Sequence, residues 1–307
     1  MMAVVEGFSA VIALIALGAL LAHIGFLTYR AQVMLTQLAF FVAGPALMLH
    51  VLATAEFGQV FSANLVVTTA AVAVTVAVYL VLARFVAPRR GGERIVAALC
   101  TCYANSANLG IPIAVFVLGD AAHVAPLMLM QLLALQPIAL ILLDRATAGP
   151  GASVATVAKR TLRNPLLLGA LLGVAIMASG IRLPDLVLTP VELVGDMAVP
   201  AMLLAYGVSL RLGPKPGAGS PRGELALIVG LKAVGQPLFA YLLGAHVLGL
   251  SAHEVLIVTV VAALPTAQNV FVIASRYERA VTLTRDAVFL ATIASVPVMF
   301  AISALLA

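Results

Sequence analysis

Residues 103–112 read Tyr-Ala-Asn-Ser-Ala-Asn-Leu-Gly-Ile-Pro, and they interrupt an apolar run long enough to cross a membrane. Pro112 has no backbone N–H and favours the start of a new helical segment, and Gly110 relaxes the chain just before it. Residues 262–269 read Ala-Ala-Leu-Pro-Thr-Ala-Gln-Asn and interrupt a second apolar run in the same way, at Pro265. The sequence therefore predicts two membrane helices that are broken near their middle.

The composition of the whole chain supports a membrane protein. The chain has 307 residues, of which 63% are hydrophobic and 9% are charged, whereas soluble proteins are roughly 45–50% apolar and about 25% charged. This balance excludes a soluble enzyme, a disordered protein and a nucleic-acid-binding domain. Uninterrupted apolar runs also exclude an outer-membrane barrel, whose strands alternate apolar and polar residues. We expect an all-α, polytopic membrane protein.

Apolar windows of about 20 residues predict ten membrane helices. They cover residues 4–24, 32–54, 62–86, 94–118, 122–144, 164–181, 190–210, 224–247, 252–275 and 284–306. If the N-terminus lies outside, every Lys and Arg except Arg182 and Lys232 falls in a loop on the cytoplasmic side. This distribution follows the positive-inside rule. We therefore expect ten helices in the cytoplasmic membrane, with both termini on its outer side.

The sequence repeats itself at an offset of 155 residues. Residues 42–49 align without gaps with residues 197–204, and further short matches share this offset. Five helices per repeat is an odd number, so the second half is predicted to enter the membrane upside down. Inverted repeats are typical of secondary transporters. The predicted organisation is a first repeat over 1–145, a cytoplasmic connector over 146–163 and a second repeat over 164–307.

Two broken helices in matching positions of inverted halves indicate a binding site at mid-membrane depth. The exposed N–H groups at such breaks carry partial positive charge and suit an anionic ligand. Side-chain amides near the breaks add hydrogen-bond donors for a carboxylate. The candidate substrate-binding residues are Asn105, Asn108, Gly110, Pro112, Pro265, Gln268, Asn269 and Lys232.

The segment 105–112, with the pattern Asn-x-x-Asn-x-Gly-x-Pro, resembles the corresponding segment of the auxin efflux carrier family. The bacterial members of that family include malonate or malate permeases. The resemblance covers the whole chain and implies the fold shared with bile acid:sodium symporters, in which two broken helices cross beside the substrate. It also implies that Asn108, Pro112, Pro265, Gln268 and Asn269 line the site. The long cytoplasmic loop of many plant members is absent, so regulation through such a loop is not expected.

Two lone ionisable residues lie within predicted helices. Lys232 is interpreted either as a counter-charge for a carboxylate substrate or as a side chain that snorkels to the cytoplasmic headgroups. Asp196 is a candidate carrier of a coupling proton if it is buried, and a structural partner of Lys232 is the alternative. Gly169 and Gly173 form a GxxxG pattern that indicates close helix packing within the bundle, and a homodimer stays open.

The predicted function is secondary active transport of small organic anions, mono- or dicarboxylates such as malonate, by alternating access with proton coupling. The alternatives are a sodium-coupled anion symporter, an exporter of auxin-like indole acids, and a channel or sensor on a transporter scaffold. The sequence contains no GxSxG or HExxH motif and no P-loop, so an enzyme, a metal centre and ATP-driven pumping are not expected. The expected partners are the organic anion and the lipid bilayer, and no cofactor is expected besides a coupling proton or sodium ion.

Overall fold

The computed structural model of this protein is helical throughout its described residues, apart from loops and an isolated antiparallel bridge between Ala104 and Thr266. The structure describes residues 2–54, 63–87, 89–110, 113–114, 117–119, 121–148, 163, 165–181, 183–213, 217 and 219–306. Most of the predicted connector therefore lies outside the described residues.

Six helical stretches within these residues are long and apolar enough to cross a membrane. They are Tyr29–Ala53, Ala63–Val86, Pro126–Thr147, Asp185–Leu212, Arg222–Val247 and Val281–Leu306. Ile12–His23, Pro165–Ser179 and Ala252–Ala262 are shorter apolar helices. An all-helical chain with several apolar helices of membrane-spanning length agrees with the predicted fold class. The count of ten helices and the inverted repeat stay predictions.

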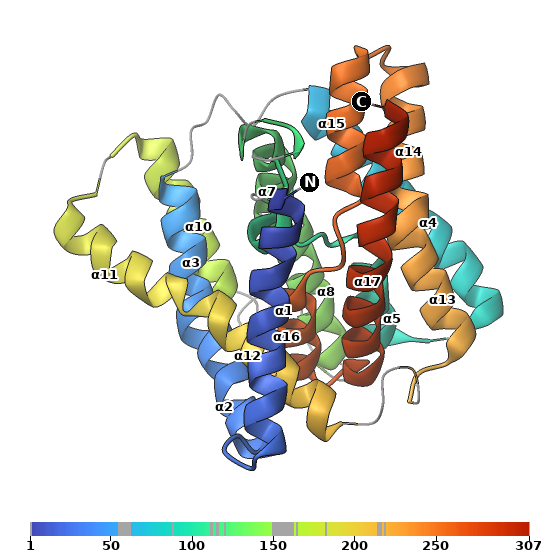
Figure 1. Cartoon of the computed structure of the whole chain (residues 1–307). Helices are drawn as coiled ribbons and strands as arrows, with labels where there is room; N and C mark the ends of the chain where they lie inside the picture. The colour runs from blue at the N-terminus through green and yellow to red at the C-terminus, as the bar shows by residue number, and fades with distance from the viewer. Residues whose placement is uncertain are drawn as a thin grey trace.

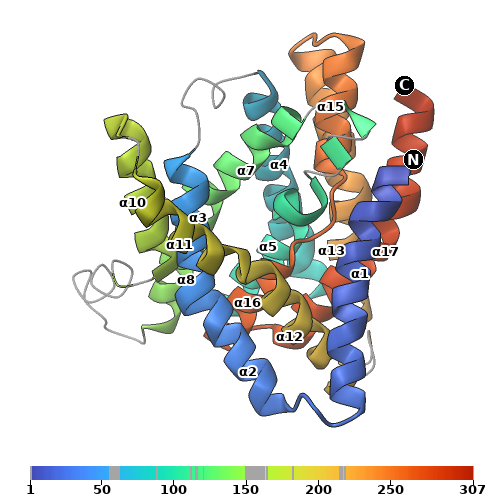
Figure 2. The same ribbon diagram turned by 60° about the vertical axis from the view of Figure 1, so that its left-hand side comes forward.

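The helices form two groups by their contacts, and Figure 1 shows α3, α10 and α11 of the first on the left and α4, α13 and α14 of the second on the right. Bundle A packs α1 against α12, α2 against α12, and α3 against both α10 and α11. Its members are α1 (Met2–His23), α2 (Tyr29–Leu38), the π-helical turn η1 (Ala39–Ala43), α3 (Gly44–Ala53), α10 (Pro165–Ser179), α11 (Asp185–Asp196) and α12 (Ala198–Leu212). Figure 2 shows α3, α10 and α11 together on one side of the molecule.

Glycines allow the helices of bundle A to approach closely. A Cβ atom on Gly169 would lie 2.4 Å from the carbonyl oxygen of Pro45, and one on Gly173 would lie 2.7 Å from Cβ of Leu52. Since both contacts join α10 to α3, the GxxxG pattern marks packing inside the bundle, as predicted. Gly207 of α12 has the same role against α1, where an added Cβ would lie 2.1 Å from the carbonyl oxygen of Ile15.

Bundle B contains the broken helices and the long helices that support them. Packing joins α4 to α5, α5 to α8, α14 to both α4 and α15, and α13 to α17. Its members are α4 (Ala63–Val86), α5 (Gly91–Cys102), η3 (Ser106–Gly110), η4 (Ala121–Val124), α7 (Ala125–Met130), η5 (Gln131–Leu135), α8 (Gln136–Thr147), α13 (Arg222–Gly230), η6 (Leu231–Gly235), α14 (Gln236–Leu242), η7 (Leu243–Val247), α15 (Ala252–Ala262), α16 (Gln268–Tyr277) and α17 (Val281–Leu306).

The chain ends and the basic loops lie at opposite ends of the molecule. Both termini are at the upper end in Figures 1 and 2. At the other end, the Arg211 side chain hydrogen-bonds His23 across 3.2 Å, and the Arg89 side chain donates to Glu224 across 2.6 Å. The first contact joins the ends of α1 and α12, and the second joins the loop after α4 to the start of α13. The positively charged loops therefore gather on one face, opposite the termini.

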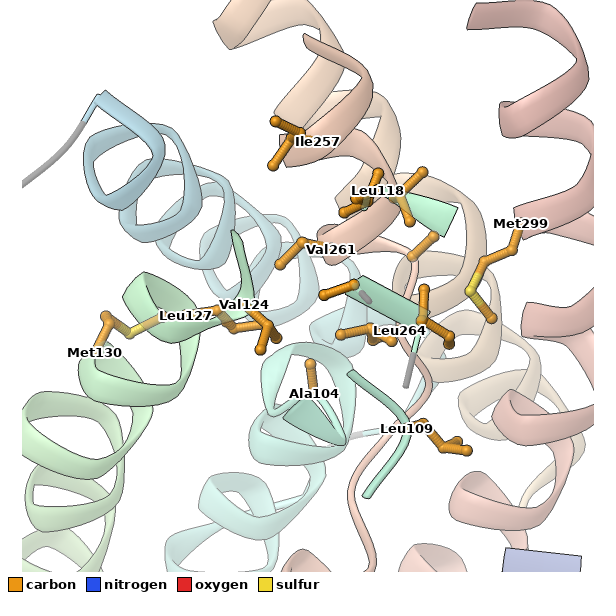
Figure 3. Packing of buried hydrophobic residues seen from close by; sticks show 14 of the residues in the cluster. Ala104, Leu109, Leu118, Val124, Leu127, Met130, Ile257, Val261, Leu264 and Met299 are labelled. Carbon is orange, nitrogen blue, oxygen red and sulfur yellow. The ribbon is translucent and has the colours of Figure 1, made fainter. Parts of the chain in front are cut away.

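Apolar residues surround the point where the two broken helices meet. Figure 3 shows Ala104, Leu109, Val124, Val261 and Leu264 gathered there from η3, η4, α15 and the two extended stretches. All five are at least nine-tenths buried. This apolar packing fixes the positions of the chain breaks within bundle B.

Candidate functional site

The two chain breaks lie side by side in antiparallel orientation. Helix α5 ends at Cys102, and η3 begins at Ser106. Helix α15 ends at Ala262, and α16 begins at Gln268. The Asn105 N–H donates to the Pro265 carbonyl across 2.8 Å, and the Ala267 N–H donates to the Tyr103 carbonyl across 3.0 Å. Each break thus satisfies backbone groups that the other has freed, which is required away from water.

The first break lies at the start of the predicted interruption, residues 103–112. The extended residues are Tyr103–Asn105, several positions before Gly110, whereas the second break includes Pro265 as predicted. Pro112 lies outside the described residues. Gly110 is a packing position, because an added Cβ would lie 2.7 Å from Cγ2 of Val124.

Amide side chains from both halves of the chain meet at the crossing. The Asn105 side-chain amide donates to Oε1 of Gln268 across 2.8 Å, and these residues are 3% and 1% exposed. Nε2 of Gln268 and Oδ1 of Asn269 are buried and have no hydrogen-bond partner. A buried amide without a partner is costly unless a ligand or water satisfies it. Gln268 and Asn269 therefore offer unused hydrogen-bonding groups at the crossing. The Asn108 side chain lies outside the described residues.

Two glutamines that sequence reasoning missed support the first break. The Ala104 N–H donates to Oε1 of Gln131 across 2.6 Å, and Nε2 of Gln131 donates to the Ser106 hydroxyl across 2.8 Å. The Tyr103 hydroxyl donates to Oε1 of Gln136 across 2.7 Å. The available signal was the presence of two amides five positions apart in an otherwise apolar stretch. Without the fold, nothing linked these amides to residues 103–106.

A cavity of about 100 Å³ lies between the crossing and bundle A. Its polar side is formed by Tyr103, Asn105, Ser106, Gln131, Gln136, Gln268 and Asn269. Its apolar side comes from η1, α3, α10 and α12. None of its described lining residues carries a charge, and the N-terminal end of α16, where free N–H groups give partial positive charge, lies against it. The cavity is suited to a small, partly apolar anion.

Neither of the two lone ionisable residues, Lys232 and Asp196, lines the cavity. Lys232 is fully buried in η6, and its ammonium donates to Oε1 of Gln236 across 2.5 Å and to the Ala262 carbonyl across 3.1 Å. It neither lines the cavity nor reaches the surface. Asp196 is exposed at the end of α11 and forms no ion pair with Lys232. The burial on which its predicted proton-carrying role depends is therefore not present in this conformation.

Within the described part of the chain, no three His, Cys, Asp or Glu side chains come together as possible metal ligands. Cys100 and Cys102 are buried free thiols on α5. The polar residues that line the crossing cavity offer hydrogen bonding and electrostatic attraction.

Similarity to known proteins extends over most of the chain. The chain is 25% identical over 272 residues to a protein of Rhizobium meliloti (strain 1021) that bears the name "Putative malonate transporter", and the match covers 84% of this chain and 83% of the relative. The family described as "Membrane transport protein" matches residues 2–147 and 150–303. The match confirms the resemblance to the auxin efflux carriers, and the chain belongs to this family of membrane transport proteins.

Proposed function

We propose that this protein is a secondary active transporter that moves small organic anions, mono- or dicarboxylates such as malonate, across the cytoplasmic membrane by alternating access. The observation that carries the proposal is the pair of broken helices, which hydrogen-bond each other beside a cavity with unpaired amide groups. Membership of a transport family and similarity to a protein named for malonate support it. Transport rather than catalysis also agrees with the family.

The distribution of the two halves between the bundles supports an inverted repeat. Bundle A takes α1–α3 from residues 1–145 and α10–α12 from residues 164–307, and bundle B takes the remaining helices of each half. At the crossing, each half donates one backbone hydrogen bond to the other, as expected for two halves related by a pseudo-twofold axis. Because the cavity lies between the bundles, a rocking motion of one against the other would expose it to alternate sides.

The distribution of charge supports an orientation in the membrane. Basic loops gather at one end of the molecule and the termini at the other. By the positive-inside rule, the basic end faces the cytoplasm and both termini face outward. We propose this topology with ten membrane helices.

Lys232 favours proton coupling over sodium coupling in this proposal. Cation sites of broken-helix transporters use carbonyl groups at the C-terminal ends of half-helices. At the end of α15, the Ala262 carbonyl instead accepts a hydrogen bond from the Lys232 ammonium. A resident positive charge at this place disfavours a sodium ion beside it. We propose Lys232, rather than the exposed Asp196, as the group that exchanges the coupling proton.

Counterflow in liposomes tests the function. Proteoliposomes loaded with malonate should accumulate labelled malonate from a dilute outside solution, faster with an imposed pH gradient and equally well when choline replaces sodium. Lys232→Met should remove the effect of the gradient, and Asp196→Asn serves as the matched control that keeps it. Absence of saturable counterflow with folded, inserted protein would contradict a malonate carrier. A sodium requirement would favour the symporter alternative.

A further inference from the structure

A second and larger cavity, of about 680 Å³, lies at the basic end of the molecule between the two bundles. We call this cavity the vestibule. It is lined by α2 and the end of α12 from bundle A, and by the end of α16 and the start of α17 from bundle B. It is separate from the crossing cavity and shares none of that cavity's lining residues.

Two hydroxyl groups in the wall of the vestibule have no partner. Thr36 is 6% exposed, and its Oγ1 atom is buried without a hydrogen bond. The Oγ atom of Ser275, on the facing helix α16, is buried without a hydrogen bond as well. Buried polar groups in folded proteins are nearly always satisfied. Both residues belong to the lining of the vestibule, so a rotation of either side chain would offer a hydroxyl to a polar occupant.

Three charged side chains belong to the described lining of the vestibule. Arg276 and Arg285 both line the vestibule, against one carboxylate, Glu278, among the described residues. Arg285 is already paired, because its guanidinium donates to Oδ1 of Asp286 across 2.7 and 3.0 Å. Arg276 has no carboxylate partner among the described residues. Arg276 and Glu278 are thus the unpaired charges of the described lining, and the Arg276 guanidinium is the group that can bind an anion.

Stacking holds the Arg276 guanidinium in place. Its Cζ atom lies 4.9 Å from the ring centroid of Phe41 and 5.8 Å from that of Phe40. Contact with ring faces leaves the N–H edge of a guanidinium available for a carboxylate. Phe41 lines the vestibule and Phe40 lines the crossing cavity. Arg276 thus contacts one residue from the lining of each cavity.

We propose that the vestibule is a second binding site for a small carboxylate anion, with Arg276 as its cation and the Thr36 and Ser275 hydroxyls as further donors. The anion would occupy it between the basic end of the molecule and the crossing cavity. This proposal rests on the transport function proposed above. It assigns a role to residues that the crossing does not use.

Thiol modification tests the site without measuring transport. Ser275→Cys replaces one oxygen by sulfur. The native Cys100 and Cys102 are fully buried, so the wild-type protein gives the background rate of labelling. We expect a negatively charged methanethiosulfonate to react with Ser275→Cys at least threefold faster than a positively charged one of similar size, after correction for their rates with a free thiol. Malonate should slow the negatively charged reagent at least twofold.

Substitutions at Arg276 supply the controls. In the Ser275→Cys background, Arg276→Gln should abolish both the charge preference and the protection by malonate, and Arg276→Lys should restore much of the charge preference. A preference that survives Arg276→Gln, a lack of protection by malonate, or no reaction with either reagent would overturn the proposal. Because labelling does not depend on turnover, protection without counterflow would contradict the transport function alone. Counterflow without protection would contradict the vestibule site alone.

Discussion

The two chain breaks perform the same structural task with different residues. In the second half, Pro265 lies inside the break, and its carbonyl accepts the N–H of Asn105. In the first half, the chain leaves the helix at Tyr103 without any proline in the extended residues, and Gln131 from η5 satisfies the Ala104 N–H. The second break contains a proline, whereas the described extended residues of the first contain none and are supported by a side chain from a distant helix. A proline can be recognised in the sequence, whereas the contact between Gln131 and Ala104 cannot.

The largest effect on the two breaks is expected at Gln268, whose side chain contacts Asn105 of the first break and lines the cavity. Gln268→Glu keeps an oxygen that Asn105 can donate to, but it replaces the unpaired N–H₂ group by a negative charge. Repulsion of an anion a few ångströms away should reduce malonate counterflow at least about a hundredfold. Gln268→Met, which removes the amide without adding charge, should reduce it only about tenfold. Equal activity of the two variants would show that the anion does not approach this position.

Gln131 and Gln136 form a matched pair for the first break. Both line the cavity from consecutive turns of one helical stretch. Gln131→Met leaves the buried Ala104 N–H without an acceptor, which should cost about 1–3 kcal/mol of folding free energy. Gln136→Met removes only the acceptor of the Tyr103 hydroxyl and should cost less. Thermal unfolding in detergent measures both, and a larger effect at Gln136 would contradict the role given to Gln131.

The smallest effect is expected at Pro265. If tertiary contacts hold both breaks, the second break does not need its proline, just as Tyr103–Asn105, the described extended residues of the first break, contain none. Pro265→Ala keeps the carbonyl that bonds Asn105, so malonate counterflow should stay within about threefold of the wild type. Complete loss of counterflow in folded Pro265→Ala protein would show that the two breaks are maintained by different forces.

Three of the residues predicted from the sequence line the crossing cavity. Asn105, Gln268 and Asn269 were predicted from their position beside a break, and all three line the crossing cavity. Lys232 was predicted to act on the substrate or to reach the headgroups, and it instead lies buried against the Ala262 carbonyl. Its environment depends on a residue 30 positions away, which no local pattern indicates.

Apolar composition, the spacing of the polar interruptions and the bias of basic residues are properties of the sequence alone, and they determined an all-helical membrane chain with breaks in two of its predicted helices. Local physics sufficed because a helix satisfies its own backbone. The tertiary structure alone decided where the first break begins, which distant glutamine satisfies it, and where the vestibule opens between the bundles. Those features depend on hydrogen bonds and cavities between helices far apart in the chain, and only the packed fold brings such groups together.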